Sequence, residues 1–212
     1  MSSEDRWPRQ GDRLFISEGN WWEKATLHWV QGWQALEVYA TGYREAAELL
    51  SSHVLQTRGD HDLLVYPIVF LWRHYVELRL KGLLRTAKQL SDDESEMHLT
   101  HGLKDYWYKL RLLIEQPRFP SIDKSDLDAV ESVIYELDSA DPSSFAFRYP
   151  FDRRGEPSKP NTGVYVDIRN FTDVMGRVSN FLDALNDYLS EYLNIKWELE
   201  LDMHNDYEDY DI

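Results

Sequence analysis

The chain has 212 residues, a formal net charge of −15, 42% hydrophobic residues and no cysteine. This hydrophobic content is sufficient for a buried core, and the lack of cysteine excludes disulfides, a thiol nucleophile and zinc–thiolate sites. The acidic balance argues against a broad nucleic-acid footprint. No apolar run is long enough to span a bilayer, and the charged residues 1–12 do not resemble a signal peptide, so we expect a cytoplasmic protein without membrane contact.

The N-terminal part is expected to hold an irregular arm, residues 1–20, followed by a long amphipathic helix. The arm is polar and lacks a hydrophobic period. From Trp22 to about Gln56, apolar residues recur at spacings of three and four, which is typical of a helix with one buried face. These residues are Trp22, Ala25, Trp29, Trp33, Leu36, Ala40, Tyr43, Ala47, Leu50 and Val54.

A second helix is predicted after a turn at residues 57–60. It is expected to begin near Val65, because Pro67 is tolerated only in the first turn of a helix, and to end at about Leu90. Charged and polar residues in its middle share an arc of roughly 120°. They are Arg73, His74, Glu77, Lys81 and Arg85.

These charges lie among apolar residues and therefore need partners. Arg73 with Glu77, and Glu77 with Lys81, have the i,i+4 spacing of helical ion pairs. Two interpretations follow. The set is either a buried charge network that fixes the position of the helix, or a site for anion binding or acid–base chemistry that includes His74.

Two shorter amphipathic helices are predicted next. The third helix is closed by Pro117, and the fourth opens at Asp123 or Ser125. The buried stripe of the third is Leu103, Tyr106, Trp107, Leu110, Leu113 and Ile114, and that of the fourth is Leu127, Val130, Ile134 and Leu137.

The pattern changes over residues 139–168, where four prolines and two glycines exclude a helix. Residues 145–149 and 164–168 alternate in polarity, so we expect two short strands joined by a long loop. Its basic residues lie near aromatic residues and could contact RNA phosphates while bases stack on the rings, although a solvated loop has the same composition. They are Arg148, Arg153, Arg154 and Lys159.

The final helix has the most regular pattern, with steps of three and four over three heptads. Its apolar residues are Phe171, Val174, Val178, Phe181, Leu185, Tyr188 and Tyr192. Residues 195–212 carry seven acidic residues after Lys196 and are expected to form a disordered tail. The fold class is therefore all-α: an antiparallel bundle of about five helices in one domain, residues 21–194, with a small two-stranded insertion before the last helix.

Motifs for several kinds of chemistry are absent from the sequence. There is no HExxH metal motif, no glycine-rich phosphate loop and no GxSxG nucleophile elbow. His98 and His101 form an i,i+3 pair without a carboxylate at ligand spacing. We therefore expect neither a metal nor a cofactor.

Four short motifs between residues 62 and 193 carry a family resemblance. They are Tyr66 to Leu84, His101-Gly102-Leu103-Lys104, Phe147-Arg148-Tyr149-Pro150 and Val166-Asp167 before the last helix. Together they resemble uncharacterised prokaryotic HEPN-like proteins. The resemblance implies a helical bundle, dimerisation and a setting in toxin–antitoxin, abortive-infection or stress systems. Many active HEPN proteins are metal-independent ribonucleases.

The catalytic signature of that family is an Arg followed four to six residues later by His. Arg169 and Arg73 have suitable following residues, but no His stands at the required distance from either, or from any other Arg in the chain. We therefore expect a non-catalytic HEPN-like interaction module that forms a homodimer and binds a protein partner. RNA is a further possible partner.

Two alternatives remain at the sequence level. One is a ribonuclease with an atypical site, whose catalytic candidates are Arg73, His74, Glu77 and Arg148. The other is a receptor for a small anion or nucleotide. The binding candidates are Lys81, His101, Arg153, Arg154 and Arg169.

Overall fold

The computed structural model describes residues 7–27, 29–97, 100–152, 154–158, 160–163 and 165–208, and for residues 203–208 it describes the backbone alone. The chain divides into two compact units, Met1–Gln31 and Gly32–Ile212. The described residues of the first unit include a short 3-10 helix, η2 (Trp21–Glu23), whose N-cap Asn20 accepts a hydrogen bond from the Trp22 amide.

The long helix predicted from Trp22 begins only at Ala35, after the short 3-10 helix η3 (Gly32–Gln34). The prediction was wrong for residues 22–34, which contain no α-helix in their described part. Trp22 and Trp29 are 75% and 67% exposed. Gly32 has a φ of 66°, a left-handed conformation that interrupts a regular helix.

Helices α1 (Ala35–Thr57) and α2 (His61–Leu90) form a helical hairpin. Only three residues join them, and Arg58 and Asp60 both adopt left-handed backbone conformations. Helix α2 begins four residues earlier than predicted and contains Pro67 in its interior. Proline has no backbone N–H, so the carbonyl of Leu63, four residues before Pro67, has no helical donor. Leu63 is 71% exposed, so water can bind that carbonyl.

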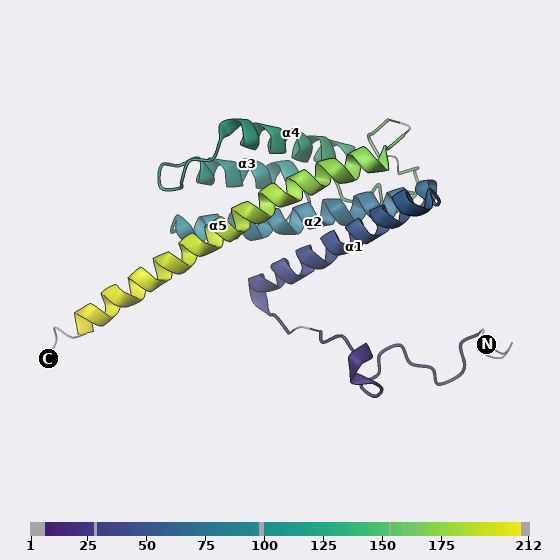
Figure 1. Cartoon of the computed structure of the whole chain (residues 1–212), viewed down its shortest axis with the longest axis horizontal. Coiled ribbons are helices and arrows are strands. Elements are labelled where there is room, and N and C mark those ends of the chain that lie inside the picture. Colours follow the sequence, from purple (N-terminus) through teal and green to yellow (C-terminus); the bar gives the residue numbers. More distant parts are fainter. Residues whose placement is uncertain are drawn as a thin grey trace. The chain divides into compact units, whose positions relative to one another are not determined.

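Helix α2 lies at the centre of the second unit. Every residue from Trp72 to Leu80 except His74 is buried, so the helix is covered on all sides over these turns. Helices α1, α3 (Leu103–Ile114) and α5 (Ile168–Glu208) all pack against it. Figure 1 shows α2 between these neighbours, with α4 (Lys124–Ala140) beside α3. The all-α bundle predicted from the sequence is confirmed.

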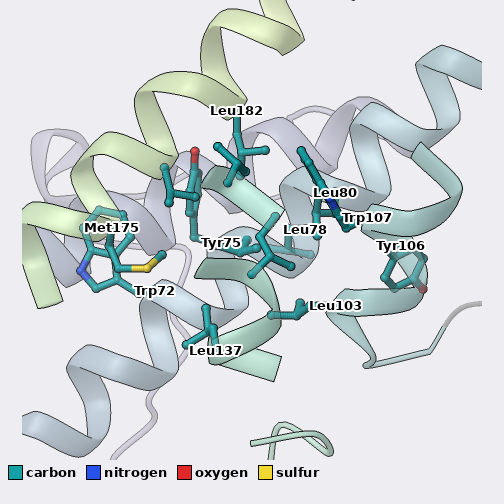
Figure 2. Close-up of a cluster of buried hydrophobic side chains, with 14 of the residues drawn as sticks. Trp72, Tyr75, Leu78, Leu80, Leu103, Tyr106, Trp107, Leu137, Met175 and Leu182 are labelled. Carbon is teal, nitrogen blue, oxygen red and sulfur yellow. The ribbon is translucent and has the colours of Figure 1, made fainter. Parts of the chain in front are cut away.

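The core joins side chains from α2, α3, α4 and α5 (Figure 2). Trp72 and Leu80 of α2 are fully buried, as are Leu103 and Trp107 of α3. The predicted stripes of α3 and α4 face this core, and Asp123 caps α4 by accepting a hydrogen bond from the Ser125 amide at 2.7 Å.

No strand forms in the described part of residues 139–168, so the two-stranded insertion was wrong; a single bridge joins Phe151 and Pro157. The Asp141 carboxylate accepts hydrogen bonds from the amides of Phe145 and Ala146, which turns the chain where a strand was expected. The alternation of residues 145–149 reflects a turn: Phe147 enters the core, while the rings of Phe145 and Tyr149 contact each other at a tilt, with their centroids 4.6 Å apart.

Helix α5 is 41 residues long and continues to Glu208, so residues 195–208 of the expected disordered tail are helical, while residues 209–212 lie outside the described residues. It begins at Ile168, where the Asp167 carboxylate accepts a hydrogen bond from the Asn170 amide at 2.9 Å. Its C-terminal part extends past the ends of α2 and α3 (Figure 1). Among the described helices, none combines the length and apolar character needed to cross a membrane.

Candidate functional site

Arg73 lies at the centre of the charges predicted on α2, and its side chain is fully buried. Its guanidinium donates to the Asp141 carbonyl at 2.9 Å, to the His101 carbonyl at 2.7 Å and to the Glu77 carboxylate at 3.2 Å. His101 stands just before α3 and Asp141 just after α4. One side chain therefore ties the start of α3 and the end of α4 to the middle of α2.

Glu77 is the buried carboxylate of this group, with 1% of its surface exposed. Its Oε1 lies 2.6 Å from Lys81 Nζ and 3.0 Å from His101 Nδ1. Burial acts to raise the pKa of Glu77, but the hydrogen bonds and charges of Lys81 and His101 outweigh it and hold the pKa below its ordinary value. Glu77 is therefore ionised at neutral pH.

Two aspartates that the sequence analysis did not select complete the charge network. Asp138 Oδ1 accepts a hydrogen bond from the Leu103 amide at 2.7 Å, which caps the start of α3, and lies 3.9 Å from Arg73 Nη2. Asp141 Oδ2 is buried and makes no hydrogen bond. A signal for Asp138 was present, because it follows Ile134 by four residues on the buried face of α4. We call Arg73, Glu77, Lys81, His101, Asp138 and Asp141 the charge network.

His74 and Arg148 lie outside the charge network, in an aromatic cluster. The His74 ring meets Tyr43 edge-on at 4.4 Å and stacks on Phe70 at 5.7 Å. The Arg148 guanidinium lies 5.4 Å from the Phe70 ring and 5.6 Å from the Tyr149 ring, and its Nε donates to the Ser144 carbonyl. The four catalytic candidates are thus divided between a buried network and a neighbouring surface.

Burial lowers the pKa of His74 from its ordinary value. The charges of Lys81, Arg148 and Arg73 lower it further, and Glu77 opposes them. The ring is therefore neutral at neutral pH, which suits its packing against two other rings.

Solvent reaches the charge network at the His101 side chain, which is 65% exposed, while Lys81 is 12% exposed. Arg73 and Glu77 lie behind them and are enclosed. The arrangement can hold a carboxylate ionised and fix three helices to one another. It presents neither Arg73 nor Glu77 to a substrate.

The remaining binding candidates do not join this network. Arg154 and Arg169 are exposed. Arg153 lies outside the described residues, as do Lys159 and His98. Within the described part of the chain, no three His, Cys, Asp or Glu side chains gather as a metal would require.

A second polar network, which the sequence analysis missed, joins α1, α2 and α5. Asp183 of α5 lies 2.8 Å from Arg79 and accepts a hydrogen bond from the Tyr75 hydroxyl at 2.8 Å. Arg44 of α1 also pairs with Asp183, and Glu37 of α1 pairs with Arg79. Burial and the charge of Asp183 raise the pKa of Tyr75, so its hydroxyl stays protonated as a donor.

A cavity of about 590 Å³ lies between the end of α2, residues 92–97 and α5. Three cations and five acids line it: Arg85, Lys88 and Lys196 with Asp92, Asp93, Glu94, Glu96 and Glu200. Lys88 pairs with Asp93 and Lys196 with Asp92, so the lining offers no excess of positive charge to an anion.

The apolar repeat of α5 continues beyond the part that was recognised from sequence. Ile195 and Leu199 extend the alternating steps of three and four, so the repeat runs without a break from Phe171 to Leu199. The exposed fraction of the residues in this repeat rises along the helix, from 5% at Leu185 to 39% at Tyr192 and 60% at Leu199. We call Leu185, Tyr188, Tyr192, Ile195 and Leu199 the α5 seam.

Comparisons with family models, curated protein sequences and solved structures give no match for this chain. The chain is an all-α helical protein with an enclosed charge network and an extended last helix. The HEPN-like resemblance stays a prediction.

Proposed function

We propose that the protein is a non-catalytic, HEPN-like helical module that binds another protein chain, in a prokaryotic defence, toxin–antitoxin or stress system. The observation that carries the proposal is the α5 seam. A repeat that alternates steps of three and four favours packing against a second helix. At Ile195 and Leu199 the helices of this chain leave the seam exposed at 43% and 60%.

The state of the catalytic candidates supports a non-catalytic role. Arg73 and Glu77 are enclosed and bonded to structural partners, and Arg148 is stacked among aromatic rings of its own chain. A general base must reach the proton that it abstracts. Neither Arg73 nor Glu77 has such access.

A homodimer is part of the proposal, as the sequence predicts. Light scattering of the purified protein at micromolar concentration should give twice the mass of one chain. A single-chain mass would contradict the homodimer. The binding of a different partner would still need its own test.

Incubation with a broad panel of single-stranded and structured RNAs tests the absence of catalysis. We expect no cleavage by the wild-type protein. Cleavage that disappears in both Arg73→Ala and His74→Ala, with both variants still helical by circular dichroism, would favour the ribonuclease alternative and contradict the proposal.

A further inference from the structure

We infer that the C-terminal half of α5 binds a basic amphipathic helix of a different protein, whose apolar face packs on the α5 seam and whose Lys and Arg side chains meet acidic residues beside it. This inference rests on the proposed function, because it names the kind of partner that binds the α5 seam.

The apolar half of the surface begins where the bundle ends. A groove of about 240 Å³ lies between residues 120–122 and the side chains of Phe181, Leu185 and Tyr188. The exposed side chains of Tyr192, Ile195 and Leu199 follow it along α5. From Tyr188 to Leu199 the seam is twelve residues long, or about 18 Å. This length accommodates roughly three turns of a second helix.

The acidic half lies on the solvent side of the seam. Asp187, Glu191 and Glu198 are exposed and fall within an arc of about 40° on the helix surface. We call these three residues the acidic edge. Within the described residues, none of its carboxylates forms an ion pair. Glu191 and Glu198 occupy the heptad position beside the seam at which opposite charges select the partner of a coiled coil.

Within the described side chains of α5, no Lys or Arg pairs with the acidic edge. After Arg177, the sequence contains one Lys or Arg, Lys196. Lys196 lies on the other side of the seam, donates to the Gln89 carbonyl at 3.0 Å and pairs with Asp92. The acidic edge therefore presents negative charge to any helix that lies on the seam.

A second copy of this chain does not fit the surface as well. Asp202 takes the next seam position after Leu199, so two paired α5 helices would bring acidic side chains together at their contact. The seven acidic residues that follow Lys196 add to the repulsion, since like charges at an interface oppose association. A helix with Lys or Arg beside its apolar face has the complementary charge.

The test uses the full-length protein and two labelled synthetic peptides. Each peptide has three heptads with Leu at the apolar positions; one carries Lys beside the apolar face and the other Glu. We expect the Lys peptide to bind, as measured by fluorescence anisotropy, and to bind more weakly at high salt. The Glu peptide should not bind.

Two variants test the two halves of the surface. Glu191→Lys/Glu198→Lys should weaken binding of the Lys peptide by at least about tenfold and allow the Glu peptide to bind. Ile195→Ser/Leu199→Ser should weaken the Lys peptide similarly. The matched control, Glu45→Lys/Glu136→Lys, makes the same change in net charge at exposed positions on α1 and α4 and should leave binding unchanged. Circular dichroism confirms that each variant is folded.

Three results would overturn the inference. The first is no binding of the Lys peptide. The second is equal loss of binding in the control and the Glu191→Lys/Glu198→Lys variant, which would indicate attraction to overall charge. The third is a dimer that Ile195→Ser/Leu199→Ser dissociates, which would make the seam a self-association surface and still support the proposed function. If the seam variant changes neither peptide binding nor mass, the proposed function fails as well.

Discussion

The imidazole Nδ1 of His101 lies 3.0 Å from the buried Oε1 of Glu77, while the backbone carbonyl of His101 accepts a hydrogen bond from Arg73. The side chain and the main chain of one residue therefore contact the same network from two directions. The His101 ring is 65% exposed, whereas its carbonyl partner Arg73 is fully buried. The two contacts are expected to differ greatly in their importance for stability.

Replacement of His101 by Ala removes the exposed contact alone. Lys81 and Arg73 still pair with Glu77, so the free energy of unfolding should fall by no more than about 1 kcal/mol, as for other exposed ion pairs. Urea denaturation followed by circular dichroism measures the change. A loss several times larger would show that the ring is essential to the network.

Replacement of Arg73 by Met removes the buried contact. The Glu77 carboxylate then loses one cationic partner, and two carbonyls lose their donor, so we expect a loss of about 3–5 kcal/mol in the free energy of unfolding. The exposed Arg154→Met serves as control and should change the free energy by less than about 0.5 kcal/mol. Equal stability of the two variants would refute the structural role of Arg73.

Asp183→Ala should also destabilise the fold, because it leaves the buried Arg79 and the Tyr75 hydroxyl without their shared acceptor. Glu37 still pairs with Arg79, so the expected loss is about 2–3 kcal/mol, which is smaller than that for Arg73. Asp187→Ala, an exposed change one turn further along α5, is the control. The urea denaturation midpoints of Asp183→Ala and Asp187→Ala, each compared with that of the wild-type protein, test the prediction.

His74 should make stability depend on pH. Well above pH 6.5, which is about the ordinary pKa of His, the ring is neutral in both the folded and the unfolded state. Below this pH the unfolded chain takes up a proton more readily than the folded protein, because the folded pKa is lowered, so the free energy of unfolding falls with pH until folded His74 is also protonated. In His74→Phe, which retains ring packing with Tyr43 and Phe70, this part of the fall should disappear. An unchanged pH profile would contradict the assignment.

Truncation after Asn194 should separate partner binding from stability. The removed side chains from Ile195 to Asp202 are largely exposed, and the truncation takes away the contacts of Lys196 with Gln89 and Asp92. We expect a loss of no more than about 1 kcal/mol in the free energy of unfolding. Binding of the Lys peptide should be abolished. Cooperative unfolding at a much lower temperature would show that the removed segment supports the bundle.

Helices whose repeating apolar residues are also the residues that pack in the core were predictable from sequence. Segments whose structure depends on backbone conformation or on long-range hydrogen bonds were not. The stripes of α3 and α4 predicted their positions closely because the same residues that repeat also pack. Trp22 and Trp29 repeat at helical spacing, yet the α-helix begins only at Ala35, after Gly32 with its left-handed backbone conformation. The Asp141 hydrogen bonds override the strand pattern of residues 145–149 in the same way.

Part of the charge network was also predictable. The pairs of Arg73 with Glu77 and of Glu77 with Lys81 follow from helical spacing and are present. The sequence could not place His101, Asp138 and Asp141 around Arg73, because these contacts join segments that are distant along the chain. His74 is adjacent to Arg73 in sequence but points to a different surface, since neighbouring helical residues diverge by about 100°.

The position of Arg73 between two helix termini also bears on how the bundle folds. Its donors can be satisfied only when the carbonyls of His101 and Asp141, 28 and 68 residues further along the chain, have both arrived. A half-assembled bundle would leave a buried cation without acceptors, which is unfavourable. If either α3 or α4 opens away from α2, the other should therefore open with it. The slowest-exchanging amides of these three helices should then share one rate of hydrogen exchange.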